Sequence, residues 1–253
     1  MRGYNSRVDK GAIAVSKTIG ILGGMGALAT VDLFHKIVDM TYSDSDSGHL
    51  HIIVDNNTLI PDRTKAILHN GPSPLPEMIR SAISLERSGA DILIMGCNTA
   101  HYYYRDICHF VKVPFLNMIK ETAAEAHRRS FCRVGLLATD GTIESGVYKN
   151  EFLEEHIDLL TPEAGHQSAV MDIIYRGVKA GRSEWNTAPL ADTLRDLEKR
   201  GAQAVILGCT ELPLAFNIYH INSRTPLIDP TAVLARQAIL AAGGRVREIA
   251  FCV

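Results

Sequence analysis

The chain has 253 residues, of which 46% are hydrophobic and 21% charged, and its formal net charge is -2. This composition is typical of a folded globular protein with one large domain or two smaller ones, and it excludes a disordered chain. Because charges of both signs are spread without long runs, the sequence offers no basic surface for nucleic acid or an anionic membrane. We therefore expect a small molecule as the ligand.

The cysteines and the N-terminus favour a cytoplasmic protein. Five cysteines, an odd number scattered along the chain, do not make a disulfide framework, which fits a reducing compartment. Residues 1–16 contain one four-residue apolar stretch at 12–15, which is too short for a signal peptide core or a membrane span. We interpret residues 1–16 as an N-terminal extension.

Short apolar runs alternate along the chain with stretches of helical period, a pattern typical of a parallel sheet with helices on both faces. The predicted strands are residues 18–22, 50–55, 91–95, 114–117, 133–138, 156–160, 204–207 and 226–228. The predicted helices include residues 27–40, 75–88 and 190–200. The sequence therefore predicts an α/β fold.

The sequence also repeats itself. The segment LERSGADILIMGCNT, from Leu85, aligns without a gap with LEKRGAQAVILGCTE, from Leu197, at an offset of 112 residues, and seven of the fifteen positions are identical. At the same offset, VPFLN at Val113 matches TPLID at Thr225. Such internal similarity indicates two related halves. Each half then carries a cysteine, Cys97 or Cys209, just after an equivalent strand.

The repeat leads to a domain prediction. We expect residues 17–118 together with 226–253 to form one α/β domain and residues 119–225 to form a second, pseudo-symmetric one. Open parallel sheets bind ligands beyond the carboxyl ends of their strands. If the two halves face each other, Cys97 and Cys209 lie on opposite sides of one cleft.

Two facing thiols allow a small set of reactions. A disulfide relay favours a C-x-x-C spacing, which the sequence lacks, and a zinc site needs more ligands than His49 and His51 supply, so we expect no metal. Stepwise proton transfer remains, in which one thiolate removes a proton from carbon and the other thiol returns one to the opposite face. A single cysteine after an apolar strand is more often a small buried residue, but the repeated pair favours chemistry.

Five segments together resemble a known family, the PLP-independent aspartate/glutamate racemases, and most closely its aspartate racemase branch. They are GILGGMGALAT, IPDRT, MGCNTAH, YRGVKAG and GCTELP, and the resemblance covers residues 17–244. It implies two pseudo-symmetric α/β domains in a homodimer, no cofactor and a dicarboxylic amino acid as substrate. Aspartate and glutamate differ by one methylene, and the residues do not separate them.

The resemblance also implies roles for individual residues. Cys97 and Cys209 are implied as acid and base, with Cys209 taking the α-proton of the L-isomer and Cys97 that of the D-isomer. Arg63 and Lys179 are implied as partners of the substrate carboxylates. From the residues alone, Arg63 and Lys179 could equally be ordinary charges near helix ends.

Further site residues follow from their neighbourhood. Proton removal beside a carboxylate builds negative charge, so donors should surround its oxygens. We expect the substrate to be bound by residues in the turns after the strands, namely Met25, Asn98, Thr99 and Thr210. Three more residues are candidates for a supporting role behind them, and for His101 and Glu211 a purely structural role stays open: His101, Thr139 and Glu211.

Other functions also fit parts of the sequence. Residues 24–29 match the dinucleotide pattern G-x-G-x-x-A after a strand, and Asp55 could bind a ribose, as in a Rossmann protein. The second half has no such turn, whereas both halves carry the cysteine. A decarboxylase acting on dicarboxylates of the malonate type, or a cis-trans isomerase, could use the same scaffold, although one thiol often suffices for those reactions.

Overall fold

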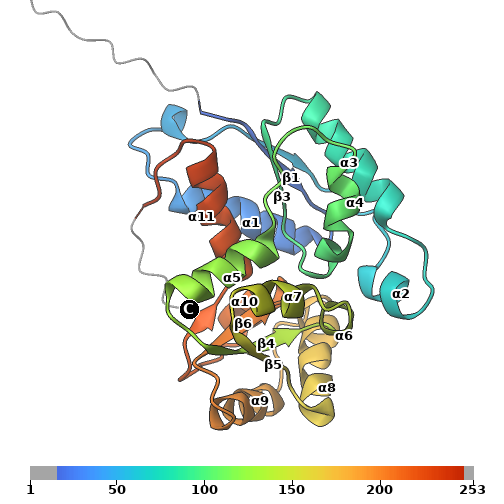
Figure 1. Cartoon of the computed structure of the whole chain (residues 1–253), viewed down its shortest axis with the longest axis vertical. Coiled ribbons are helices and arrows are strands. Elements are labelled where there is room, and N and C mark those ends of the chain that lie inside the picture. Colours follow the sequence, from blue (N-terminus) through green and yellow to red (C-terminus); the bar gives the residue numbers. More distant parts are fainter. Residues whose placement is uncertain (1–15, 248–253) are drawn as a thin grey trace, which may run out of the picture.

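The computed structural model describes residues 16–247 and contains two parallel sheets (Figure 1). The first sheet has the order β2-β1-β3 and the second the order β5-β4-β6-β7. The strands are β1 Ile19–Leu22, β2 Ile52–Asp55, β3 Ile92–Met95, β4 Arg133–Ala138, β5 Asp158–Leu160, β6 Ala204–Gly208 and β7 Leu227–Ile228. The predicted α/β class is confirmed. The predicted extension at 1–16 lies outside the described residues, apart from Ser16.

The helices of the first half cover both faces of its sheet. They are α1 Ala27–Met40, α2 Arg63–Leu68, α3 Leu75–Arg87 and α4 Tyr104–Cys108, with short 3-10 segments η1 Asp46–Gly48 and η2 Thr99–Tyr103. Strands β1 and β3 are buried throughout, as continuous apolar runs in a parallel sheet require. Leu33 of α1 packs on one face and Met78 of α3 on the other.

The second half repeats this arrangement. Its helices are α6 Asp140–Glu144, α7 Val147–Glu154, α8 Ala164–Asp172, α9 Ala188–Lys199 and α10 Glu211–Ile218, with a π-helical segment η3 Ile173–Val178. In both sheets the first strand of the half is flanked by the second and third, as β2-β1-β3 and β5-β4-β6. Phe115 forms a single parallel bridge with Leu93 beside β3, where the other half has Leu227 beside β6. The repeat therefore has a structural counterpart.

Two helices connect the halves by crossing over. Helix α5 Met118–Arg128 follows the first sheet but packs Ile119 and Ala123 against the core of the second. Helix α11 Pro230–Ala241 follows the second sheet but packs Leu234 and Ile239 against the first. The two helices also pack against each other between the sheets (Figure 1). This exchange fixes how the two halves face each other.

The chain returns to the first half slightly later than the predicted domain boundary. We expected it at residue 226, but Leu227 and Ile228 pair with Val205 and Ile206 of the second sheet. The chain leaves that sheet at Asp229, whose carboxylate accepts a hydrogen bond from the Thr231 N–H at the start of α11. This short strand covers the edge of β6, in the position that Phe115 occupies beside β3 in the other half.

The predicted strand at 114–117 is shorter than expected. Leu93 N–H donates to Pro114 O at 2.8 Å and Leu116 N–H to Leu93 O at 3.0 Å, so pairing is limited to one bridge. Pro114 has no N–H for a ladder, and Asn117 instead caps α5 by accepting hydrogen bonds from the N–H groups of Ile119 and Lys120.

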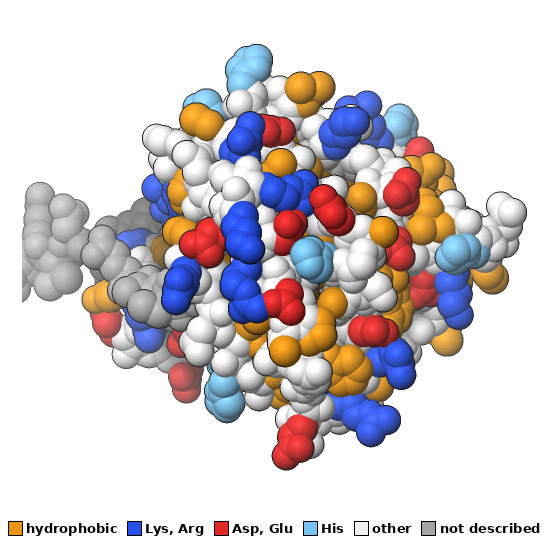
Figure 2. Space-filling model, turned by 90° about the horizontal axis from the view of Figure 1, so that it is seen from below, with side chains coloured by type: hydrophobic (Ala, Val, Ile, Leu, Met, Phe, Trp, Pro, Cys, Tyr) orange, Lys and Arg blue, Asp and Glu red, His pale blue; other side chains and the backbone are white. Residues whose placement is uncertain are grey.

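The surface carries charges of both signs. Figure 2 shows one face, on which Lys and Arg side chains are interspersed with Asp and Glu. Helix α9 contains an ion pair between Arg195 and Asp192, and Asp196 of α9 pairs with Arg200, the residue that follows the helix. Within residues 16–247, no helix combines the length and apolar character needed to cross a membrane.

Candidate active site

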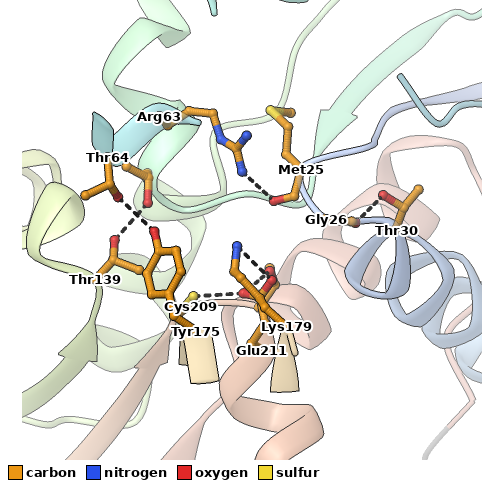
Figure 3. Close-up of polar contacts among 12 residues, drawn as sticks. Met25, Gly26, Thr30, Arg63, Thr64, Thr139, Tyr175, Lys179, Cys209 and Glu211 are labelled. Atoms are coloured by element: carbon orange, nitrogen blue, oxygen red, sulfur yellow. Dashed lines mark hydrogen bonds and ion pairs between the residues drawn. The ribbon is translucent and has the colours of Figure 1, made fainter. Parts of the chain in front are cut away.

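One cavity lies where the carboxyl ends of strands from both sheets meet, and Figure 3 shows part of it. Turns after β1, β3, β4 and β6 supply its walls, together with α2 and η3. The lining residues are Met25, Asp62, Arg63, Thr64, Cys97, Asn98, Thr99, Thr139, Tyr175, Lys179, Cys209, Thr210 and Glu211. This set includes every site residue that we predicted from the sequence except His101, which lies behind Cys97.

The two thiols reach this cavity from different sheets. Cys97 follows β3 and Cys209 follows β6, and these two residues are 6% and 7% exposed. The glycine before each cysteine packs against a core leucine: a Cβ at Gly96 would lie 2.9 Å from Leu33 Cδ2, and one at Gly208 would lie 2.5 Å from Leu136 Cδ1. A larger residue at either position would require the leucine side chain to move.

Arg63 begins α2 and extends into the cavity. Its Nη2 donates to Met25 O at 3.0 Å (Figure 3). Its Nη1 donates to Pro61 O at 3.0 Å, and its buried Nε has no partner within the described chain. Burial lowers the pKa of the guanidinium, but the neighbouring Cys97 and Asp62 outweigh it, so the pKa lies above its ordinary value. The cavity therefore holds a fixed cation with an unused donor.

Lys179, Glu211 and Cys209 form a second polar group on the opposite side. Lys179 Nζ lies 3.2 Å from Glu211 Oε1 and 5.1 Å from the centre of the Tyr175 ring, and Cys209 Sγ donates to Glu211 Oε2 at 2.9 Å (Figure 3). Burial and then the Glu211 carboxylate raise the pKa of the Cys209 thiol well above its ordinary value, while Lys179 lowers it. Burial lowers the pKa of Lys179, but Glu211 and Cys209 raise it above its usual range.

Hydroxyl groups connect the two halves across the cavity. Thr99 Oγ1 lies 3.1 Å from Thr139 Oγ1 and 2.7 Å from Thr142 Oγ1, so a turn of the first half contacts α6 of the second. On the same side, a Cβ at Gly141 would lie 2.7 Å from Thr64 Oγ1, so α2 and α6 are in close contact. The free space among these side chains is about 10 Å³, room for about one water.

Asn98 is held by a residue that the sequence did not suggest. Tyr148 of α7, 1% exposed, donates its hydroxyl hydrogen to Asn98 Oδ1 at 2.6 Å. Burial keeps the pKa of this phenol well above its ordinary value, so the hydroxyl remains a donor. The Asn98 amide nitrogen is thereby turned away from Tyr148, and it is buried with no partner within residues 16–247. It is available to a ligand in the cavity.

His101 supports the backbone of Cys97. Its Nε2 accepts the Met118 N–H at 3.1 Å, which leaves Nδ1 protonated and donating to Cys97 O at 2.8 Å. Burial lowers the pKa of this ring to about 4. His101 is thus a neutral link between the Cys97 turn and α5, and its ring does not line the cavity.

This link predicts a pH-dependent stability. The ring is neutral in the folded protein down to about pH 4, whereas in the unfolded chain it protonates near pH 6.5, so stability falls as the pH drops between these values. Between about pH 7 and about pH 5, we expect the wild type to lose about 2 kcal/mol more unfolding free energy than His101→Gln. Urea denaturation at both pH values measures this difference.

A matched control for this experiment is His109→Gln. His109 is exposed, and its Nδ1 makes the same type of contact with the carbonyl four residues earlier, 2.7 Å from Arg105 O. Its replacement should leave the pH dependence as in the wild type. An equal pH dependence in His101→Gln and the wild type would show that His101 is not held neutral.

The structure does not support the dinucleotide interpretation of the glycine turn. Gly24 has φ = +86°, and a Cβ there would collide with the backbone of Asn57, so the glycine serves close packing. The N-terminus of α1, where a pyrophosphate would bind, faces Glu211, since a Cβ at Gly26 would lie 3.5 Å from Glu211 Oε1. A carboxylate in this position repels phosphate.

Fold and site together define an α/β protein of two similar halves, with a buried cavity between them that holds two thiols and two cations. Residues 22–238 match the family described as Asp/Glu/hydantoin racemase. The chain belongs to this family and is an enzyme of the amino-acid racemase class. The predicted family is therefore confirmed.

Individual relatives agree with this assignment. The solved aspartate racemase of Picrophilus torridus is 32% identical, with a TM-score of 0.78, covering 92% of this chain and 96% of that chain. The broad specificity amino-acid racemase RacX of Bacillus subtilis (strain 168) is 29% identical over 227 residues, 87% of this chain and 96% of that protein. Glutamate racemase of Francisella tularensis, solved with D-glutamate, shares the fold, with 18% identity, a TM-score of 0.64 and coverage of 88% and 79%.

Two tyrosines of the site were missed by the sequence analysis. Tyr175 precedes Lys179 by one helical turn, and its hydroxyl lies 3.4 Å from Thr64 Oγ1 (Figure 3). The spacing of Tyr175 and Lys179 places them on one face of a helix, a signal that was present in the sequence. Tyr148 reaches Asn98 only through the packing of α7, and the sequence carries no signal for that contact.

The Tyr148 contact predicts a loss of activity without loss of fold. In Tyr148→Phe the Asn98 amide is no longer fixed, so we expect kcat/KM for racemisation to fall by about tenfold, the size of one lost hydrogen bond. Initial rates on the preferred amino acid measure this effect. Tyr102→Phe, at a tyrosine that is 50% exposed, is the matched control and should behave as the wild type. An unchanged kcat/KM in Tyr148→Phe would contradict the role assigned to Asn98.

Proposed function

We propose that this protein interconverts the L and D forms of an acidic amino acid, aspartate or glutamate, without a cofactor. One of the two cysteines, as thiolate, takes the α-proton. The bonding electrons pass to the α-carboxylate, and the opposite cysteine, as thiol, gives a proton to the other face of the α-carbon. The stereocentre is inverted, and each sulfur has exchanged its protonation state with the other.

The observation that carries this proposal is the meeting of two buried thiols at one cavity from two different sheets. Cys97 and Cys209 both line it, and the Gly-Cys turns that present them come from equivalent strands of the two halves. Proton transfer on two faces of one carbon requires two such groups, each reaching the carbon from its own side. A decarboxylase or cis-trans isomerase often needs one thiol, so the pair favours racemisation.

The cations of the cavity favour a substrate with two carboxylates. Arg63 offers its unpartnered Nε, and Lys179 lies on the other side beside Cys209. Both stay protonated, because neighbouring negative charge raises the pKa of each. An acidic amino acid carries one carboxylate for each cation. Of the relatives described above, the one that is 32% identical is named an aspartate racemase and the one that is 29% identical a broad specificity amino-acid racemase.

The charge that develops at the α-carboxylate also needs donors. The buried Asn98 amide nitrogen has no partner within the described residues, and the hydroxyls of Thr99 and Thr210 line the same cavity. Fixed donors in a site without bulk water stabilise such charge strongly, because they need not reorient during the reaction. The turns after the strands thus provide what the intermediate requires.

Chiral chromatography tests this proposal directly. The purified protein is incubated without pyridoxal phosphate with L-aspartate, L-glutamate, L-asparagine or L-lysine. We expect the D-isomer of an acidic amino acid to form with a kcat/KM at least about tenfold above that of asparagine, which differs from aspartate by one charge. Equal or faster racemisation of asparagine or lysine would contradict the acidic substrate, and no racemisation of any of them would contradict the function.

A further inference from the structure

The two thiols of the cavity have different surroundings. Cys209 Sγ donates a hydrogen bond to Glu211 Oε2 at 2.9 Å (Figure 3). The charged groups that act on Cys97 are instead two cations, the Arg63 guanidinium and the Lys179 ammonium. A carboxylate stabilises a thiol as a hydrogen-bond donor and repels a thiolate. A guanidinium has the opposite effect on a thiolate. The pseudo-symmetry of the halves therefore does not extend to the charges beside the sulfurs.

Glu211 is held in place by several polar partners. It is 5% exposed, its Oε1 lies 3.2 Å from Lys179 Nζ, and its Oε2 accepts the Thr210 hydroxyl at 3.2 Å. The N-terminus of α1 faces Oε1 at Gly26, and no acidic residue of its own occupies the first turn of that helix. The acceptor of the Cys209 hydrogen is thus a buried carboxyl group that lies between the Lys179 ammonium and the N-terminal end of α1.

The other groups around Cys209 do not offset this carboxylate. The titratable groups that face it are Glu211 of α10, Lys179 and Tyr175 at η3, Tyr148 of α7 and, across the cavity, Cys97. Lys179 is the cation among them, and it is already paired with Glu211. Burial of Cys209 acts in the same direction as the carboxylate, because it disfavours a thiolate.

We propose that Glu211 keeps Cys209 as a protonated thiol in the free enzyme, so that Cys209 is the proton donor of the first turnover and Cys97 the acceptor. The inference rests on the proposed two-thiol reaction and adds an order to it. The free enzyme is then ready for the enantiomer whose α-proton faces Cys97. Glu211 acts through Cys209 and is a positioning residue that does not touch the reacting carbon.

The proton balance of that first turnover is simple. Cys97 thiolate forms an S–H bond as the substrate Cα–H bond breaks, and the Cys209 S–H bond breaks as a new Cα–H bond forms. Cys209 is left as a thiolate beside Glu211, an unfavourable pair of like charges. It regains a proton either from the opposite enantiomer in the reverse reaction or from water, and Cys97 then releases one. Because enantiomers have equal free energies, kcat/KM must stay equal in both directions, so the asymmetry is visible in the thiols themselves.

Ultraviolet absorbance of the thiolate tests this order without any substrate. The difference between the titration of the wild type and that of Cys209→Ala isolates Cys209. The same subtraction in a Glu211→Gln background isolates Cys209 without the carboxylate. We expect the Cys209 titration in Glu211→Gln to move to lower pH by about one unit or more, a tenfold or larger loss of proton affinity. Glu211→Asp should retain most of the wild-type behaviour.

The controls separate charge from structure. Glu198→Gln makes the same chemical change at an exposed position of α9 and should leave the Cys209 titration unchanged. An unchanged titration in Glu211→Gln would overturn the proposal. If that variant does not fold, the titration of the wild-type protein still tests the proposal. A Cys209 pKa below the ordinary thiol value of about 8.5 would overturn it. Since no substrate is present, these results stand whether or not acidic amino acids are racemised.

Discussion

Alanine at Cys97 or at Cys209 is expected to lower kcat for racemisation by about a thousandfold or more, in both directions. General acid or base groups contribute about this much, and each thiol is needed in every turnover because one takes the proton that the other must replace. Both side chains are nearly buried, yet each replacement removes a single sulfur, so the fold should persist. Initial rates with L and D substrate, followed by circular dichroism, measure the effect.

Two other cysteines provide the comparison. Cys108 and Cys132 are free thiols away from the cavity, and alanine at either position should retain wild-type activity. Serine at Cys97 or Cys209 keeps the shape and loses the acidity of the thiol, so it should be nearly as inactive as alanine. Residual activity within tenfold of the wild type in either alanine variant would show that the reaction does not need both sulfurs.

Arg63→Lys is expected to reduce kcat/KM by about a hundredfold, although the charge is retained. A lysine cannot reproduce the planar fork that contacts Met25 O and Pro61 O while leaving Nε for a carboxylate. One lost charge-assisted hydrogen bond costs about 1.5–3 kcal/mol, or about one to two powers of ten. Steady-state kinetics on the preferred acidic amino acid measure this, with the larger part of the effect expected in KM.

The matched control is Arg80→Lys in helix α3. Arg80 is mostly exposed and pairs with Glu77 on the same helix, so this replacement should change neither kcat nor KM. A wild-type kcat/KM in Arg63→Lys would mean that the cavity needs only a positive charge at this position. That result would remove the argument for a directed hydrogen bond from Arg63 Nε to a substrate carboxylate.

The internal repeat explains why much of the fold and both thiols could be predicted from the sequence. Parallel strands buried on both faces are continuous apolar runs, so β3 and β6 were recognisable, and the aligned Gly-Cys pairs followed from them. Helix α1 was predicted with its observed ends, since the glycine turn precedes it and its apolar face is periodic. These features are local, and a sequence records local patterns directly.

Contacts between the halves could not be predicted in this way. Tyr148 reaches Asn98 from 50 residues away, and Tyr175 contacts Thr64 from 111 residues away. Tyr175 carried a local signal in its spacing to Lys179, but nothing in the sequence indicated that either tyrosine contacts the other half. The roles of Arg63 and Lys179 came from the family resemblance, because an arginine or lysine near a helix end is ordinary in itself.

For Glu211 the sequence left two roles open, a purely structural one and a supporting one in the site. A glutamate in a first helical turn complements the helix dipole, and this is where α10 places it. The same side chain also turns toward Cys209 and Lys179, two residues that come from different segments of the second half. His101 was likewise open between tuning the thiol and structural support, and both of its ring nitrogens contact backbone atoms.

Racemisation of L-aspartate, or of whichever acidic amino acid is preferred, in deuterium oxide tests the two-thiol account most directly. At low conversion, the account predicts deuterium at the α-carbon of the D product and protium in the recovered L substrate, because the proton removed by one sulfur is not the one returned by the other. Mass spectrometry of the separated enantiomers reads both. Protium carried into the D product together with deuterium in the recovered L substrate would indicate a single base acting on both faces, and would contradict the account.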